Sequence, residues 1–175
     1  AYTANTLISE LIDRCRRTDG LRNYYDIAVV GYCNGRVEML LDPAGFVPID
    51  RLAARTPETS VICSQHASDD GEILVAHTVK LWIEAQMLHV RDMAKAWCAD
   101  PRNRESFPPV VINITDGETS DCDDDELIDI CSQIRRISTD DGGTLLFNIH
   151  LSTASEKPAM IFPSRHELAG AGQYA

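Results

Sequence analysis

Residues 108–118 constrain the fold more than any other part of the chain. They form an apolar, β-branched run that stops at an aspartate followed by a glycine, Pro-Pro-Val-Val-Ile-Asn-Ile-Thr-Asp-Gly-Glu. The valines and isoleucines at 110–114 predict a strand buried on both faces, which is typical of a parallel sheet covered by helices. Open α/β sheets bind ligands in the crevice at the carboxyl ends of their strands, and Asp116 is predicted to stand at such an end.

Asp116 is therefore a candidate ligand for a divalent cation. Gly117 lets the backbone turn sharply after it, and in this arrangement α/β folds present a hard oxygen ligand to Mg²⁺ or Mn²⁺. An Asp-Gly pair is also a common way to begin a loop, because both residues tolerate turn conformations. The residue types alone leave both interpretations open, a metal ligand and a structural turn.

Several segments follow one another in an order that resembles a known family. They are an amphipathic helix, an apolar strand, the strand and loop described above, a second apolar strand and a final apolar segment, at residues 7–15, 25–32, 111–118, 143–152 and 159–164. Together they resemble von Willebrand factor A domains of the bacterial type. The resemblance implies an α/β, Rossmann-like fold of three layers, with a mostly parallel central sheet, one antiparallel edge strand and helices on both faces.

The same resemblance implies a metal-ion-dependent adhesion site. Asp116 would be one ligand of Mg²⁺ or Mn²⁺, and the rim that meets the partner protein would be formed by Gly117, Glu118 and Thr119. The family holds its ion with three loops, and two of them are missing from this sequence: an Asp-x-Ser-x-Ser loop and a threonine loop. The resemblance thus carries over one metal ligand, Asp116.

The missing loops lead to an expectation about the natural chain. The sequence begins at Ala1 inside what matches the helix after the first loop, and Gln86 runs directly into Met87 where the threonine loop would stand. A sheet without its first strand would expose unpaired backbone N–H and C=O groups. We therefore expect a natural chain with an N-terminal strand, its metal loop, and a short loop between Gln86 and Met87.

Composition limits the function classes. The 175 residues, 44% hydrophobic and 25% charged, suit a single domain over 1–175. A net charge of −11 argues against nucleic-acid binding, which needs cations on phosphates. The sequence contains no run of about 18 apolar residues, so no membrane span is predicted. The six cysteines form no Cys-x-x-Cys pair and predict reduced thiols in a cytoplasmic protein.

Two function classes fit these observations. In the first, the chain is a binding module and not an enzyme: the ion at Asp116 completes its coordination with a carboxylate of an unknown partner protein. In the second, it is a Mg²⁺-dependent phosphoryl-transfer or hydrolytic enzyme in which the ion acts as a Lewis acid. Glu118 and Asp121 offer further carboxylates for the enzyme, but no lysine follows a strand end. We predict the binding module; a metal-free scaffold of the same fold is a third alternative.

The remaining patterns predict local elements. Apolar residues at helical spacing predict helices at 87–98 and 127–137, and the three aspartates at 123–125 complement the dipole of the second one. Asn34-Gly35 predicts a tight turn that pairs the strand at 25–32 with residues 36–41. Residues 42–72 are predicted to be a long, mixed connection with a short strand at 61–63.

Overall fold

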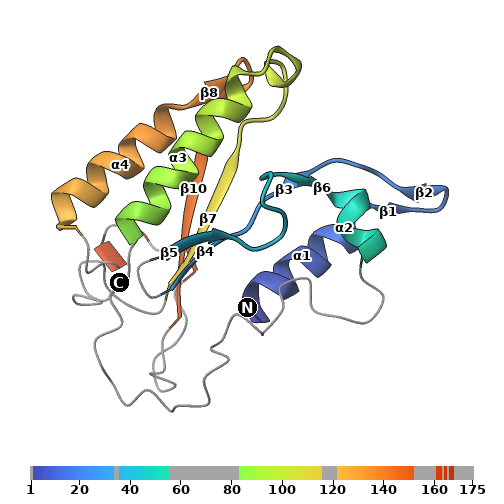
Figure 1. Ribbon diagram of the computed structural model, residues 1–175, viewed down its shortest axis with the longest axis horizontal. Helices are drawn as coiled ribbons and strands as arrows, with labels where there is room; N and C mark the ends of the chain where they lie inside the picture. The colour runs from blue at the N-terminus through green and yellow to red at the C-terminus, as the bar shows by residue number, and fades with distance from the viewer. Residues whose placement is uncertain are drawn as a thin grey trace. The chain divides into compact units, whose positions relative to one another are not determined.

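The computed structural model describes residues 2–33, 36–55, 83–115, 122–151, 161, 162, 164, 166 and 167. Contacts between Cα atoms divide the chain into two compact units, Ala1–Val79 and Lys80–Ala175. In Figure 1 the first unit runs from blue to teal and the second from green to red. The single domain over 1–175 stays a prediction.

The first unit is built on one amphipathic helix. Ile8, Ile12 and Cys15 of α1 are buried and pack with Ile49, so the apolar stripe predicted from the sequence does face a core. Its elements are α1 (Tyr2–Cys15), β1 (Arg16–Arg17), β2 (Gly20–Leu21), β3 (Asp26–Ile27), β4 (Val30–Cys33), β5 (Arg36–Met39), β6 (Val47–Pro48) and α2 (Ile49–Arg55).

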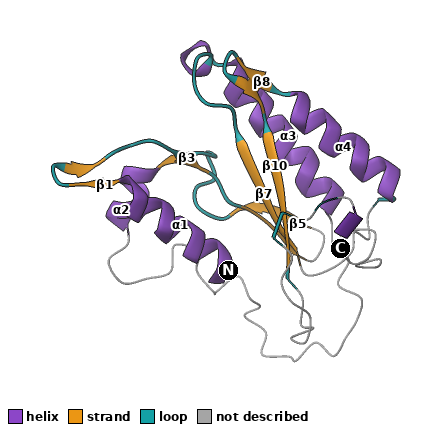
Figure 2. Ribbon diagram, turned by 180° about the vertical axis from the view of Figure 1, so that it is seen from behind, coloured by secondary structure: helices purple, strands orange, loops and turns teal. Residues whose placement is uncertain are grey.

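The second unit packs two helices on a two-stranded ribbon. Its elements are α3 (Ile83–Ala99), a 3-10 turn (Pro101–Asn103), β7 (Val110–Thr115), α4 (Asp124–Arg136), β8 (Ser138–Thr139), β9 (Gly142–Gly143) and β10 (Leu145–His150). Figures 1 and 2 show α3 and α4 side by side on the same side of the β7–β10 ribbon. The buried side chains of this unit include Met87 and Ala94 of α3 and Ile130 and Ile134 of α4.

The predicted fold class is wrong. Every sheet within the described residues has two strands, and β10–β7 is the parallel pair; β1–β2, β3–β6, β4–β5 and β8–β9 are antiparallel. The described part of the chain therefore contains α-helices and small sheets but no extended, mostly parallel central sheet with helices on both faces.

The error comes from the assumption that β7 is buried on both faces. Val110 and Ile112 are 48% and 43% exposed, and their register partners Leu145 and Phe147 are exposed as well. An apolar, β-branched run indicates a strand, but the number of strands beside it and the cover on each face depend on distant segments. The apolar run correctly predicted the strand β7, but it did not indicate which strands pair with β7 or how far its faces are covered.

The predicted hairpin and the two predicted helices are confirmed, whereas one strand differs in its bounds. β4 and β5 form the hairpin, with Val30 opposite Met39, but the strand expected at 25–32 is divided into β3 and β4. The helices expected at 87–98 and 127–137 are present as α3 and α4. The connection expected at 42–72 contains β6 and the seven-residue helix α2, whose Ile49 and Leu52 are buried. Two buried positions are too few to give a helical period. A short strand considered at 61–63 lies outside the described residues.

A helix followed at once by a tight hairpin occurs in both units. α1 leads into β1–β2, where Arg16 is opposite Leu21, and α4 leads into β8–β9, where Ser138 is opposite Gly143. Gly20 and Gly142, the first residues after the two-residue turns, have φ angles of 131° and 150°. Residues other than glycine rarely adopt these φ angles. The Asp-Gly pair at the end of each turn is therefore the sequence signal for the hairpin, and it was missed.

Among the described residues, no helix is both long enough and apolar enough to cross a membrane.

Candidate functional site

The candidate site is approached by two parallel strands that end together. β7 and β10 are aligned from Val110 and Leu145 at one end to Thr115 and His150 at the other. The amide of Leu151 donates to the carbonyl of Thr115 at 2.8 Å, which continues the pairing past the end of β10. Thr115 is 7% exposed. The residue directly before Asp116 is therefore fixed in the unit.

The predicted site residues themselves lie in the segment 116–121, outside the described residues. This applies to Asp116 as the metal ligand and to Gly117, Glu118 and Thr119 as the partner-binding rim. Their mutual geometry stays a prediction. The described residues on either side of this segment are Thr115, at the end of β7, and Cys122, shortly before α4.

Two acidic residues that follow this segment, Asp123 and Glu126, cap the helix α4. The Asp123 carboxylate accepts from the amide of Glu126 at 2.9 Å, and the Glu126 carboxylate accepts from the amide of Asp123 at 3.1 Å. This reciprocal pair is a capping box, which satisfies backbone donors that the first turn of a helix leaves unpaired. Asp123 and Glu126 thus stabilise the start of α4.

Replacing Asp123 by alanine should destabilise the protein by about 1 kcal/mol, because the helix loses its N-cap acceptor. Asp125→Ala is the matched control: it removes the same charge from the same turn but leaves the capping box intact. Urea denaturation followed by circular dichroism measures both variants. Equal losses of stability in the two would show that charge near the helix dipole, and not the cap, is what matters.

Sequence reasoning missed a polar pair between the two parallel strands. The Asn113 amide Nδ2 donates to the Asn148 Oδ1 at 2.8 Å, and the two residues are register partners. They share a face of the ribbon with Thr115 and His150, because strand residues two apart lie on the same face. The available signal was an asparagine at the same distance from the end of each apolar run, Val-Ile-Asn-Ile-Thr and Leu-Phe-Asn-Ile-His.

The Asn113 Oδ1 atom is buried and has no hydrogen-bond partner among the described groups. A buried carbonyl oxygen without a donor costs free energy, since it has lost its water. The asparagine pair ties β7 to β10 midway along the ribbon and keeps their ends aligned.

The described residues do not by themselves fit a metal ion. Within them, no three His, Cys, Asp or Glu side chains come together in a way that would hold one. Among the described carboxylates that follow Asp116, those of Asp123 and Glu126 are engaged in the cap of α4.

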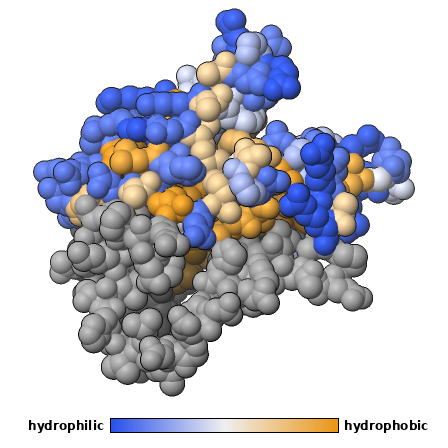
Figure 3. Space-filling view, in the orientation of Figure 1, coloured by the Kyte–Doolittle hydropathy of each residue, from blue (hydrophilic) through white to orange (hydrophobic). Residues whose placement is uncertain are grey.

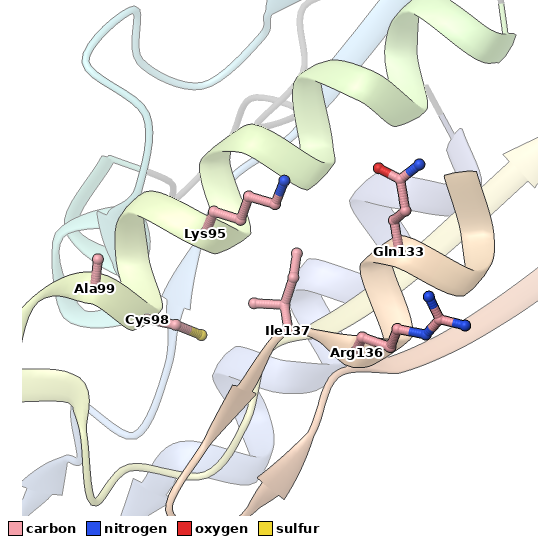
Figure 4. Close-up of a pocket in the computed structure, with 6 residues that line it drawn as sticks. All are labelled: Lys95, Cys98, Ala99, Gln133, Arg136 and Ile137. Atoms are coloured by element: carbon pink, nitrogen blue, oxygen red, sulfur yellow. The ribbon is translucent and has the colours of Figure 1, made fainter. Parts of the chain in front are cut away.

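A pocket of about 480 Å³ lies between the C-terminal parts of α3 and α4. Figure 4 shows its lining, which consists of Lys95, Cys98, Ala99, Gln133, Arg136 and Ile137. Gln133 is held in place there, because it accepts from Arg91 at 3.0 Å and donates to Asp129 at 2.8 Å. Lys95 and Arg136 lie near helix C-termini, where cations balance the helix dipole.

The thiols in this region are not activated nucleophiles. Burial raises the pKa of Cys98 above its usual value, and burial is also the main cause that raises the pKa of Cys131. A thiol with a raised pKa stays protonated near neutral pH, whereas the thiolate is the reactive form. The two thiols of this region are therefore held in their protonated form.

The clearest pKa shift also has a structural cause. Hydrogen bonds from the Arg102 side chain and backbone lower the pKa of Asp100 to about 2, and Asp100 caps the short 3-10 turn. This pKa is depressed in the folded protein, so the interaction stabilises the folded state fully above the ordinary pKa of 3.8. Its stabilisation is lost as the pH falls toward 2.

No protein-family model, curated protein or solved structure matches the chain. The resemblance to von Willebrand factor A domains therefore rests on the sequence segments quoted above.

Proposed function

We propose that the chain is a protein-interaction module whose binding to a partner protein depends on Mg²⁺ or Mn²⁺ held in part by Asp116. The observation that supports this most is the parallel, in-register pairing of β7 with β10 up to Thr115. A residue that directly follows β7 starts from an edge where two strands end together, which is where α/β proteins bind ligands.

The residue types after β7 suit the proposal. Asp116 supplies a hard oxygen ligand, and Glu118 and Asp121 add two further carboxylates within the same short segment. When bound, the ion would accept a carboxylate from the partner, with Gly117, Glu118 and Thr119 at the rim. No bond is made or broken in such a contact, so the module needs no general base and no phosphate-clamping cation.

A thermal melt with and without metal tests the proposal. A ligand that binds only the folded state stabilises it by about 2.7 kcal/mol at about one hundred times its Kd. For a chain of this size, that stabilisation corresponds to a rise of roughly 5–11 °C in Tm. We expect this rise with Mg²⁺ or Mn²⁺ relative to EDTA.

The same protein, assayed on phosphoester and nucleotide substrates, should show no turnover. Metal-dependent turnover that disappears in Asp116→Ala would favour the enzyme instead. A Tm that is the same in EDTA and in either metal would favour the metal-free scaffold.

A further inference from the structure

The first unit concentrates arginines at one end of α1. Although the whole chain has a net charge of −11 and 16 basic residues, four arginines fall within residues 14–22. They are Arg14, Arg16, Arg17 and Arg22. Two exposed tyrosines, Tyr24 and Tyr25, follow after Asn23. We call these six residues the arginine–tyrosine patch.

The backbone explains why these arginines gather. α1 ends at the buried Cys15, and the β1–β2 hairpin reverses the chain so that the amide of Arg22 donates to the carbonyl of Cys15 at 3.0 Å. Residues on both sides of the turn are thereby brought to the C-terminal end of one helix. The hairpin stands at the right of Figure 1, and the same place in Figure 3 is mostly hydrophilic.

Arg17 is held in a defined position. Its Nη1 donates to the carbonyls of Arg14 and Arg16, at 2.9 Å each, and its guanidinium lies 5.9 Å from the centre of the Tyr24 ring. Stacking on an aromatic face and bonding to the open end of the helix restrict the side chain before any partner arrives. A restrained arginine loses less conformational entropy on binding.

The local acidic residues neutralise only part of the charge. Arg16 pairs with Asp13 and Arg22 pairs with Asp19, and both pairs are exposed. Arg14 has no ion pair among the described residues, and the partners of the Arg17 guanidinium are neutral. Glu10 and Asp26 also lie close to this stretch in the sequence, so the patch has no large net charge. What it offers is two guanidiniums, those of Arg14 and Arg17, that have no carboxylate partner among the described residues.

The tyrosines make the patch a surface for a protein segment rather than for a simple inorganic anion. Tyr24 and Tyr25 are 59% and 46% exposed. Arginine and tyrosine are enriched at the energetically important positions of protein interfaces, because both offer a large flat surface together with hydrogen bonds.

We propose that the arginine–tyrosine patch binds an acidic peptide segment of a partner protein. Nucleic acid is the less suitable polyanion, since its binding requires many phosphate contacts along an extended surface and the rest of this chain is acidic. A short acidic segment can occupy the patch alone. This surface belongs to the first unit, so the proposal stands independently of Asp116.

The test uses the full chain and a fluorescein-labelled peptide of about twelve residues in which glutamates alternate with leucines. Fluorescence anisotropy gives the Kd at about 50 mM salt. Two lost charge contacts of an exposed surface should weaken binding about tenfold in Arg14→Gln/Arg22→Gln. The matched control, Arg51→Gln/Arg135→Gln, removes the same charge from exposed residues outside the patch and should change Kd less than about twofold.

Three further measurements complete the test. Tyr24→Ser should weaken binding about threefold, because Arg17 loses its aromatic support. In the unaltered protein, the peptide should shift the amide NMR signals of residues 14–25. A glutamine–leucine peptide, an oligothymidylate and phosphatidylserine vesicles should all bind more weakly than the acidic peptide.

Equal weakening in the two double variants, or NMR shifts confined to residues outside 14–25, would overturn the proposal. Tighter binding of the oligothymidylate or of the vesicles would overturn it in favour of a nucleic acid or a membrane surface.

Discussion

Replacing Asp116 by alanine is expected to remove the whole metal-dependent rise in Tm, and with it all metal-dependent binding of the partner protein. Asp116 is the one residue that both the strand-end position and the family resemblance assign as a ligand. Without metal, the variant should be about as stable as the unaltered protein, because removing one of several clustered carboxylates relieves repulsion. Paired thermal melts in EDTA and in Mg²⁺ measure both effects.

Asp141→Ala is the control for this variant. It removes the same charge from an exposed residue in the β8–β9 turn, and it should keep the full metal response. If Mg²⁺ raises the Tm of Asp116→Ala as much as that of Asp141→Ala, then Asp116 is not a metal ligand. The proposal that a metal ion at Asp116 binds the partner protein then fails.

Replacing Ile134 by alanine should destabilise the protein by about 2–5 kcal/mol. Ile134 is fully buried on α4, in the second unit. Truncating it removes buried apolar surface and leaves a cavity that close-packed neighbours fill only in part. Urea denaturation followed by circular dichroism gives the change in the free energy of unfolding.

Ile128→Ala is the matched control, because Ile128 lies on the same helix and is 62% exposed. The chemical change is identical, and the expected loss of stability is below about 0.5 kcal/mol. Similar losses in the two variants would mean that α4 does not pack with its Ile134 face against a core.

Part of the candidate site follows from the sequence alone. The strand before Asp116 and the acidic helix start after it are local features, since they depend on side chains a few residues apart. The cap formed by Asp123 and Glu126 is local too, because an aspartate followed three residues later by a glutamate is typical of a capping box. The sequence could not predict that Asn113 bonds to Asn148. The asparagine bond joins segments 35 positions apart, and only folding brings them together.

The same division holds for the fold. Local sequence patterns predict α1, α4, the β4–β5 hairpin and the strand character of β7 and β10, because helical periodicity, an Asn-Gly pair and β-branched runs act over short distances. The pairing of β7 with β10 and the exposure of Val110 and Ile112 follow only from the folded structure. Pairing between strands depends on closing long loops and on competition among distant segments, and a run of apolar residues carries no information about either.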